Sequence, residues 1–237
     1  MTAHIKTKQL TFLLALTFLF LFSGSSIVLG DNLEDGMDAA KKGDLKTAYQ
    51  LWLPLAEQGV AEAQSNLGVL YRNGLGVLQD YKEAGKWYRL SAEQGRADAQ
   101  NDLGFMYQNG QGVLQDFKEA LRLFRLSAEQ GYADAQVSVG FMYDEGQGVP
   151  QNYEEAIKWW RLAADQGSSK AQNNLGLTYA RGQGVPQDYV SAHMWFNLAG
   201  SREHEKSVEF KDRIEKKMSP SQIEKAQEMA RNWKPKK

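Results

Sequence analysis

The chain has 237 residues, and a 36-residue period within it constrains the fold more than any other feature. Four blocks superpose without a gap: 60–95, 96–131, 132–167 and 168–203. In every block column 4 is alanine, column 9 is glycine and column 12 is tyrosine. A fixed period of about 20 to 50 residues indicates a solenoid, in which each unit buries its apolar face only against its neighbours. We therefore expect one elongated domain that offers an extended surface to a partner.

Each block begins with a predicted helix. Columns 4, 8 and 12 fall on one helical face because they are four residues apart, and in the first block they are Ala63, Leu67 and Tyr71. A glycine inside a helix costs about 1 kcal/mol relative to alanine. The recurrence of glycine at column 9 therefore predicts close approach by the neighbouring helix.

A Gly-x-Gly-Val loop follows this first helix, for example at Gly74 and Gly76. The first glycine can take the left-handed conformation that ends a helix, and the second permits a tight turn. The second helix starts at Asp or Asn with Glu three residues later, which resembles a capping box. These pairs are Asp80 with Glu83, Asp116 with Glu119, and Asn152 with Glu155. The tryptophans that follow are expected to pack in the core or between repeats: Trp87, Trp159, Trp160 and Trp195.

The combined pattern resembles the Sel-one-like repeat family, a subclass of tetratricopeptide-like α/α solenoids. The resemblance covers 60–200 and rests on the glycine spacing, the aromatic columns and the period. It implies an all-α fold, a right-handed α/α superhelix. It also implies a non-catalytic adaptor or scaffold that binds other proteins or peptides, often at or outside the bacterial envelope.

Both ends of the repeat array are predicted to differ from its middle. Upstream, 45–59 aligns with a second helix and 33–42 makes a shortened first helix, which gives an N-terminal half-repeat and cap over 31–59. Downstream, Ser191 replaces the capping acid and Glu203 replaces the closing glycine, as expected of a terminal repeat. We predict two capping helices within 204–233, the second starting at Ser219 and Pro220, and a basic tail that completes 204–237.

The first thirty residues have the order of a secretory signal peptide. A basic segment with Lys6 and Lys8 precedes an apolar run over 10–22 and a stretch rich in small residues. We predict cleavage after Gly30, with cleavage near Ser25 as the alternative, and an exported protein that is periplasmic or secreted. An uncleaved anchor is less favoured because the apolar run is shorter than the roughly 20 residues of a spanning helix. No membrane span is expected after cleavage.

Composition argues against several classes of site. The formal net charge is −1, but residues 31–200 hold 15 basic and 22 acidic residues, whereas 201–237 hold 11 and 7. An acidic array with a basic tail is unlike a nucleic-acid binder, which shows a basic stripe. The chain has no cysteine, and hence no disulfide, thiolate metal site or cysteine nucleophile. We expect neither a cofactor nor a metal.

One column of the first helix is not explained by the predicted core. Column 10 points about 160° away from the core face, yet it holds Val69, Phe105, Phe141 and Leu177. Polar and mostly acidic residues flank this apolar line, so we predict that it binds a protein or peptide with basic flanks. The alternative, that column 10 packs against the adjacent repeat or rests exposed, stays open. The flanking residues predicted to take part are Asn66, Asn73, Asp102, Asn109, Ser138, Glu145, Asn174 and Arg181.

No catalytic residue is predicted. Past the signal segment the histidines are His193, expected to be packed or at the surface, and His204, expected to be solvated. The chain lacks a Ser-His-Asp order, His-Glu-x-x-His and Gly-x-Ser-x-Gly. Cysteine-rich secreted relatives of the family have been called β-lactam-binding or β-lactam-hydrolysing, and the lack of cysteine here argues against that alternative. A peptidoglycan- or glycan-binding module is the other alternative, because such a module would use exposed aromatic side chains such as Phe105 and Phe141.

Overall fold

The computed structural model describes residues 32–201 and 205–235, so the predicted signal peptide and His204 lie outside the described residues. Helices and their connections make up these ranges, without a strand, which confirms the all-α, α/α solenoid class. Contacts divide the chain into two compact units, Met1–Gln94 and Gly95–Lys237, whose described parts we call unit 1 and unit 2. The division falls at the end of the first 36-residue block, where the sequence predicted no boundary. Within the described ranges no helix is both long and apolar enough to cross a membrane.

Unit 1 shows that the N-terminal segment forms a two-helix repeat. Residues 32–41 are helical, and α2 (Leu45–Glu57), α3 (Ala61–Asn73) and α4 (Tyr81–Glu93) follow. Gly36 lies against the ring of Trp52, and the Trp52 indole N–H donates to the carbonyl of Leu33 at 3.3 Å. The same glycine–aromatic contact joins the two helices of later repeats. The expected half-repeat is thus a repeat with a short turn in place of the Gly-x-Gly-Val loop.

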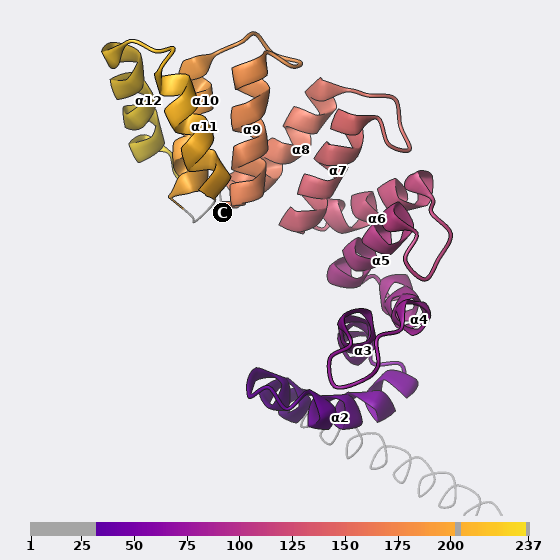
Figure 1. Cartoon of the computed structure of the whole chain (residues 1–237). Coiled ribbons are helices and arrows are strands. Elements are labelled where there is room, and N and C mark those ends of the chain that lie inside the picture. Colours follow the sequence, from indigo (N-terminus) through magenta and orange to yellow (C-terminus); the bar gives the residue numbers. More distant parts are fainter. Residues whose placement is uncertain (1–31, 202–204, 236–237) are drawn as a thin grey trace, which may run out of the picture. The chain divides into compact units, whose positions relative to one another are not determined.

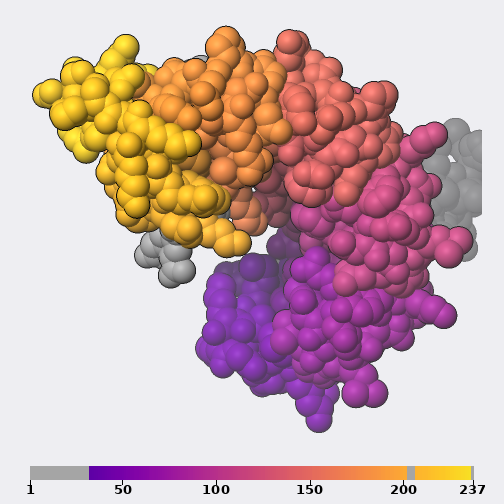
Figure 2. Space-filling model, turned by 45° about the horizontal axis from the view of Figure 1, so that its top comes forward, coloured from indigo at the N-terminus to yellow at the C-terminus, as the bar shows by residue number. Residues whose placement is uncertain are grey.

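Unit 2 contains three further repeats and two terminal helices (Figure 1). Its helices are α5 (Ala97–Asn109), α6 (Phe117–Glu129), α7 (Ala133–Glu145), α8 (Tyr153–Asp165), α9 (Ser169–Arg181), α10 (Tyr189–Gly200), α11 (Glu205–Glu215) and α12 (Pro220–Asn232). The pairs α5/α6, α7/α8 and α9/α10 form repeats 2, 3 and 4, numbered after the 36-residue blocks 96–131, 132–167 and 168–203, and each repeat contacts the next. On the surface of unit 2 the segments follow one another in the same order, from magenta to yellow (Figure 2).

The glycine of the first helix lets the two helices of a repeat touch. A Cβ at Gly104 would lie 2.8 Å from the Phe124 ring, and one at Gly140 would lie 2.5 Å from Cδ1 of Trp160. The Trp160 indole N–H also donates to the carbonyl of Val137, one turn earlier in α7, at 3.2 Å. The predicted close approach is confirmed, and the neighbour is the second helix of the same repeat. The tryptophans are buried at Trp87, Trp160 and Trp195 and half-buried at Trp159.

The Gly-x-Gly-Val loop ends one helix and reaches the previous repeat. Gly146 ends α7 in the left-handed conformation, with φ of 67°. Gly148 also has a positive φ, 71°, and a Cβ on it would lie 2.6 Å from the carbonyl carbon of Phe117 at the start of α6. The second glycine is therefore required by close contact between repeats as well as by the turn.

The predicted N-caps are confirmed, but the predicted capping boxes are not closed. The Asp116 carboxylate accepts from the backbone N–H of Glu119 at 3.0 Å. A closed capping box would need the backbone N–H of Asp116 to donate to the Glu119 carboxylate. That N–H donates instead to the carbonyl of Tyr107, at 2.9 Å. Glu119 instead pairs with Arg122 at 2.7 Å, one turn along α6.

The two terminal helices, α11 and α12, pack against the last repeat of unit 2. At the start of α12 the side chains of Ser219 and Gln222 each bond the backbone of the other, which makes a complete capping box. Ala230 of α12 is buried against α10, and Trp233 meets Trp195 edge-on with ring centroids 6.2 Å apart. These contacts give the last repeat the apolar partner that a following repeat would otherwise supply.

Buried glutamines join successive repeats, which the sequence analysis did not predict. Gln136 is 5% exposed, its Oε1 accepts from Gln166 at 2.8 Å, and its amide donates to the carbonyl of Ala128 in the previous repeat at 3.2 Å. Gln100 accepts from Gln130 in the same way at 2.7 Å. A buried amide needs such partners, because an unpaired one costs about 1–3 kcal/mol.

Candidate interaction surface

In unit 2 the predicted apolar line lies on three successive first helices. Phe105 is on α5, Phe141 on α7 and Leu177 on α9, and we call these three residues the column-10 stripe. Phe141 is 40% exposed, whereas Phe105 and Leu177 are half-buried. Phe141 is thus the ring of the stripe that scaffold packing leaves most open to solvent.

Phe105 differs from the expectation that its column points away from the core. Its ring centroid lies 5.0 Å from that of Phe124, with the planes at 72°, and the side chain packs against the core of unit 2. The Phe124 ring also lies against Gly104, so Gly104 and Phe105 contact the same ring. Replacing Phe105 should therefore cost stability, which makes Phe141 the better probe of binding.

Carboxylates gather beside the stripe near the starts of α5 and α7. Burial raises the pKa of Tyr132, and the charges of Asp134, Asp102 and Asp98 raise it further, so all three acids act on one ring. Asp98 also forms an ion pair with Arg96 at 2.9 Å. Asp134 in turn lies 3.6 Å from Nζ of Lys170, an exposed pair that compensates its charge only in part.

The predicted flanking residues do not all face solvent. Ser138 is buried and its hydroxyl donates to the carbonyl of Asp134 at 2.9 Å, so its predicted place at the surface is wrong. Asn109 is exposed, but its amide donates to the carbonyl of Phe105 at 2.8 Å. Of the others, Asp102 and Asn174 are half-buried, and Glu145 and Arg181 are exposed.

Unit 1 carries the remaining member of the column. Val69 of α3 is half-buried, as is Asn66, whereas Asn73 is exposed and donates to the carbonyl of Val69 at 2.9 Å. Valine offers a partner less apolar surface than phenylalanine. The stripe in unit 2 is therefore the stronger candidate.

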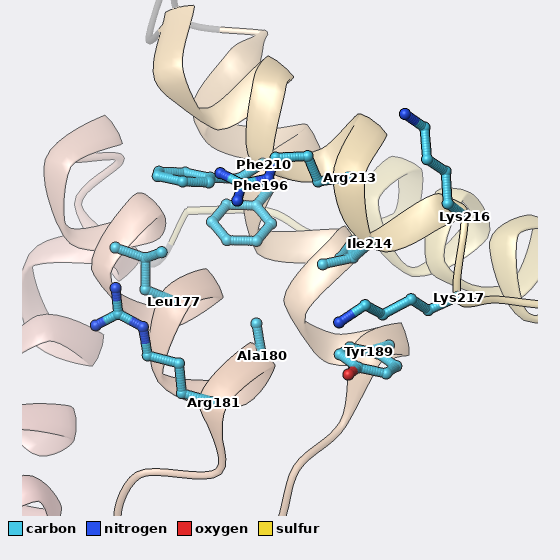
Figure 3. Close-up of a pocket in the computed structure, with 10 residues that line it drawn as sticks. All are labelled: Leu177, Ala180, Arg181, Tyr189, Phe196, Phe210, Arg213, Ile214, Lys216 and Lys217. Atoms are coloured by element: carbon cyan, nitrogen blue, oxygen red, sulfur yellow. The ribbon is translucent and has the colours of Figure 1, made fainter.

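At the C-terminal end of unit 2 the stripe meets a pocket of about 430 Å³ between α9, α10 and α11 (Figure 3). Leu177 lines it together with Tyr189 and Phe196 of α10 and Phe210 and Ile214 of α11. The basic residues that line it are Arg181, Arg213, Lys216 and Lys217. Sequence reasoning named Leu177 and Arg181 but missed the others. The sequence does carry a signal for them: two apolar residues, Phe210 and Ile214, are four positions apart, and so are two basic residues, Arg213 and Lys217.

Two polar contacts hold α11 in place as the wall of this pocket. His193 of α10 is 1% exposed, and its Nε2 lies 2.6 Å from Oε1 of Glu215. The hydroxyl of Ser207 donates to Oδ1 of Asn173 in α9 at 2.9 Å. His193 is thus packed, one of the two outcomes expected for it. Within the described ranges no group of three or more His, Asp or Glu side chains could hold a metal ion.

A family model of the Sel1 repeat matches five segments: 27–60, 61–95, 97–132, 133–168 and 169–204. The chain belongs to the Sel1 repeat family. The first match covers the segment expected to be a half-repeat, in agreement with the contact between Gly36 and Trp52. Sel1 repeat proteins generally act as scaffolds for protein interactions.

Solved structures of other Sel1 repeat proteins resemble this one. A Sel1 repeat protein from Oxalobacter formigenes has 30% identity and a TM-score of 0.74, over 85% of this chain and 82% of that one. The protein c5321, a protective antigen present in uropathogenic Escherichia coli strains, has 31% identity and a TM-score of 0.63 over 86% of this chain. This chain covers only 52% of c5321. A Sel1 repeat protein from Klebsiella pneumoniae shares the fold at 22% identity, with a TM-score of 0.54, over 79% of this chain and 93% of that one. No curated protein matches the chain.

Proposed function

We propose that this Sel1 repeat protein is a non-catalytic adaptor or scaffold that binds a segment of another polypeptide across the first helices of unit 2. The observation that carries the proposal is Phe141, a large ring that is 40% exposed on α7. Phe105 and Leu177 occupy the same column of the first helices of the neighbouring repeats. An apolar surface rimmed by polar residues is typical of interaction sites. The general role of Sel1 repeat proteins supports the same conclusion.

The acids beside the stripe favour a partner segment with basic residues. The Asp134 side chain is 53% exposed and has only a long ion pair, with Lys170 at 3.6 Å, and Asp102 acts together with it on Tyr132. A solvent-exposed ion pair contributes only about 0–1 kcal/mol. The apolar contacts would therefore supply most of the affinity, and the acids would set the orientation and the association rate.

A photo-crosslinking amino acid placed at residue 141 tests the proposal. A matched control carries the same group at Leu162, which is 50% exposed on α8, the second helix of the same repeat. We expect a polypeptide adduct from residue 141 and none from residue 162, and we expect Phe141→Ser to prevent pull-down of that polypeptide. Equal adducts from both positions, or none from residue 141, would contradict the proposal.

The two alternatives are tested with the same protein. Binding to purified sacculi that Phe141→Ser abolishes would favour a glycan-binding module over a protein-binding one. Hydrolysis of the chromogenic β-lactam nitrocefin would favour an enzyme.

Export to the periplasm or the medium is also part of the proposal. It rests on the order of basic, apolar and small residues in the first thirty positions. The mass of the mature protein should correspond to a chain that starts at Asp31. A mass that includes residues 1–30 would contradict cleavage.

A further inference from the structure

The pocket at the end of the column-10 stripe combines an apolar floor with a basic rim. Leu177, Phe196, Phe210 and Ile214 supply apolar surface, and Tyr189 closes one side (Figure 3). The volume of about 430 Å³ lies within the range of about 300–1,000 Å³ that is typical of ligand pockets. The space is large enough to take a bulky side chain of a partner.

The basic groups are interleaved with the aromatic ones. Nζ of Lys217 lies 5.5 Å from the centre of the Tyr189 ring, and the Lys217 chain extends across the pocket, whereas Lys216 points away from it. The Arg213 guanidinium lies 5.8 Å from the centre of the Phe210 ring. A ligand in this pocket would therefore meet positive charge and apolar surface side by side.

These cations have little compensation from acids. Arg213 has one weak ion pair, with Glu209 at 3.8 Å, in which both side chains are well exposed. In the part of the chain that the structure describes, Arg181, Lys216 and Lys217 form no ion pair. The C-terminal ends of α9 and α11 lie beside the pocket, and each helix end carries the equivalent of about half a negative charge. Lys216 points away from the pocket, and Arg181 also acts on the carboxylate of Asp144. The two remaining full charges, on Arg213 and Lys217, still outweigh two such half charges, so the pocket favours an anion.

We propose that this pocket binds the carboxyl-terminal residue of a partner polypeptide, with the α-carboxylate towards the cations and an apolar side chain on the floor. The inference rests on the proposed function and names the part of the partner that is recognised. A carboxyl-terminal residue carries its carboxylate and its side chain on one Cα, which matches a pocket that interleaves the two chemistries over a short distance. Bonds between cations and a carboxylate are about twice as strong as neutral hydrogen bonds.

The charge distribution of unit 2 also fixes the direction of the bound segment. The acids near the stripe, Asp102 and Asp134, lie on repeats 2 and 3, whereas the basic pocket lies at repeat 4 and α11. A segment with basic residues upstream and a free carboxylate at its end complements both regions. Such a segment runs from α5 towards α11 in its own N-to-C direction.

Fluorescence anisotropy with synthetic peptides tests this inference. The probe has an N-terminal fluorophore, two lysines, a Gly-Ser spacer and a Leu-Phe end, and it is made as the free acid and as the carboxyl-terminal amide. We expect the amide to bind about tenfold more weakly, because it loses the charge-assisted bonds. Exchanging the terminal Phe for Ser should weaken the free acid by a similar factor. Equal affinity of acid and amide would overturn the inference.

A pair of double variants assigns the effect to the pocket. Arg213→Gln with Lys217→Gln should weaken the free-acid peptide about tenfold and leave the amide nearly unchanged. Arg231→Gln with Lys234→Gln removes the same net charge from exposed positions in and after α12, and should leave both peptides within about twofold. Melting curves of both variants check that the fold is intact. Equal losses in the two variants would overturn the inference.

Two further outcomes separate this inference from the proposed function. If residue 141 still crosslinks to a polypeptide while acid and amide bind equally, the inference fails and the scaffold function stands. If phosphatidylglycerol vesicles bind, lose binding in the pocket variant and displace no peptide, the pocket recognises an anionic lipid surface and the inference is overturned.

Discussion

Repeats 3 and 4 of unit 2 share an interior and differ on their outer surface. In repeat 3 Gly140 contacts Trp160, and in repeat 4 Gly176 contacts Phe196 in the same geometry. The two repeats also end their first helix at a left-handed glycine and start the second at a side-chain cap. The interior columns thus specify the fold of a repeat regardless of its position.

The columns on the outer face of the second helix determine whether another helix packs on the repeat. In α8 they hold Lys158, which pairs with Glu155, and Leu162, which is 50% exposed. In α10 the same columns as Lys158 and Leu162 hold Met194 and Leu198, only 8% and 9% exposed, because α12 packs against α10. The exchange of a charge for methionine therefore makes the last repeat a docking site for the terminal helices, and their docking in turn forms the basic pocket.

The largest expected effect on stability comes from exchanging Met194 and Lys158, which occupy the same outer column of repeats 4 and 3. Met194→Lys places an ammonium group between α10 and α12, where it has lost water, and should lower the free energy of unfolding by at least about 2 kcal/mol. Lys158→Met makes the opposite exchange at the same column of repeat 3. It should change stability by no more than about 0.5 kcal/mol, because it removes only an exposed ion pair.

Denaturant titrations of both variants measure this difference. A protease-sensitivity assay on Met194→Lys should show cleavage between α10 and α12 before the rest of unit 2. Equal effects of the two substitutions would mean that the outer columns of repeats 3 and 4 do not differ in the way described.

A smaller effect is expected in the shared interior. Gly140→Ala would put a Cβ 2.5 Å from Cδ1 of Trp160, and such overpacking typically costs about 1–3 kcal/mol. Without that contact the change would instead stabilise a helix by about 1 kcal/mol, so the sign of the effect tests the contact. In a double-mutant cycle, Trp160→Leu should destabilise the Gly140→Ala protein less than it destabilises the wild type. Independent effects would contradict the contact.

The interior was predictable from the sequence because each of its contacts recurs at a fixed column. The close helix approach at the glycine, the helix ends and the N-caps were all predicted for this reason. Both helices of the N-terminal segment were predicted, but as a half-repeat, because its shorter turn places Gly36 four residues later than the period requires. The buried glutamines were missed because polarity alone suggests exposure, although Gln100 and Gln136 recur at one column and their partners at another.

The candidate site was only partly predictable, because it depends on contacts that do not recur every 36 residues. A helical wheel places Phe105 relative to its own helix, but the ring of Phe124 reaches it from the second helix. The pocket depends on how α11 docks, which follows from single contacts such as that between His193 and Glu215. Both residues lie in stretches where the repeat pattern gives no partner.

The smallest expected effect concerns the cap of α10, again by comparison with an earlier repeat. Burial by itself would raise the pKa of Asp188, but the hydroxyl of Ser191, at 2.6 Å, and the backbone N–H groups of Ser191 and Val190 outweigh it and lower the pKa. A lowered pKa in the folded state gives stability that is present above the unfolded value of about 3.9 and is lost as the pH falls through the folded value. Ser191→Ala should raise the pKa of Asp188 and cost about 1 kcal/mol at neutral pH.

The matched control is Glu119→Ala, at the same column of repeat 2, where the side chain pairs with Arg122 and gives no bond to the capping carboxylate of Asp116. It should change stability by less than about 0.5 kcal/mol. Carboxyl NMR titration of Asp188 together with unfolding curves between about pH 3 and pH 7 measures both effects. Because the hydroxyl bonds the charged carboxylate more strongly than the neutral acid, the stability difference between the proteins with and without Ser191 should shrink towards the acid end of that range. A stability difference that persisted there would show that Ser191 acts by packing and not through the cap.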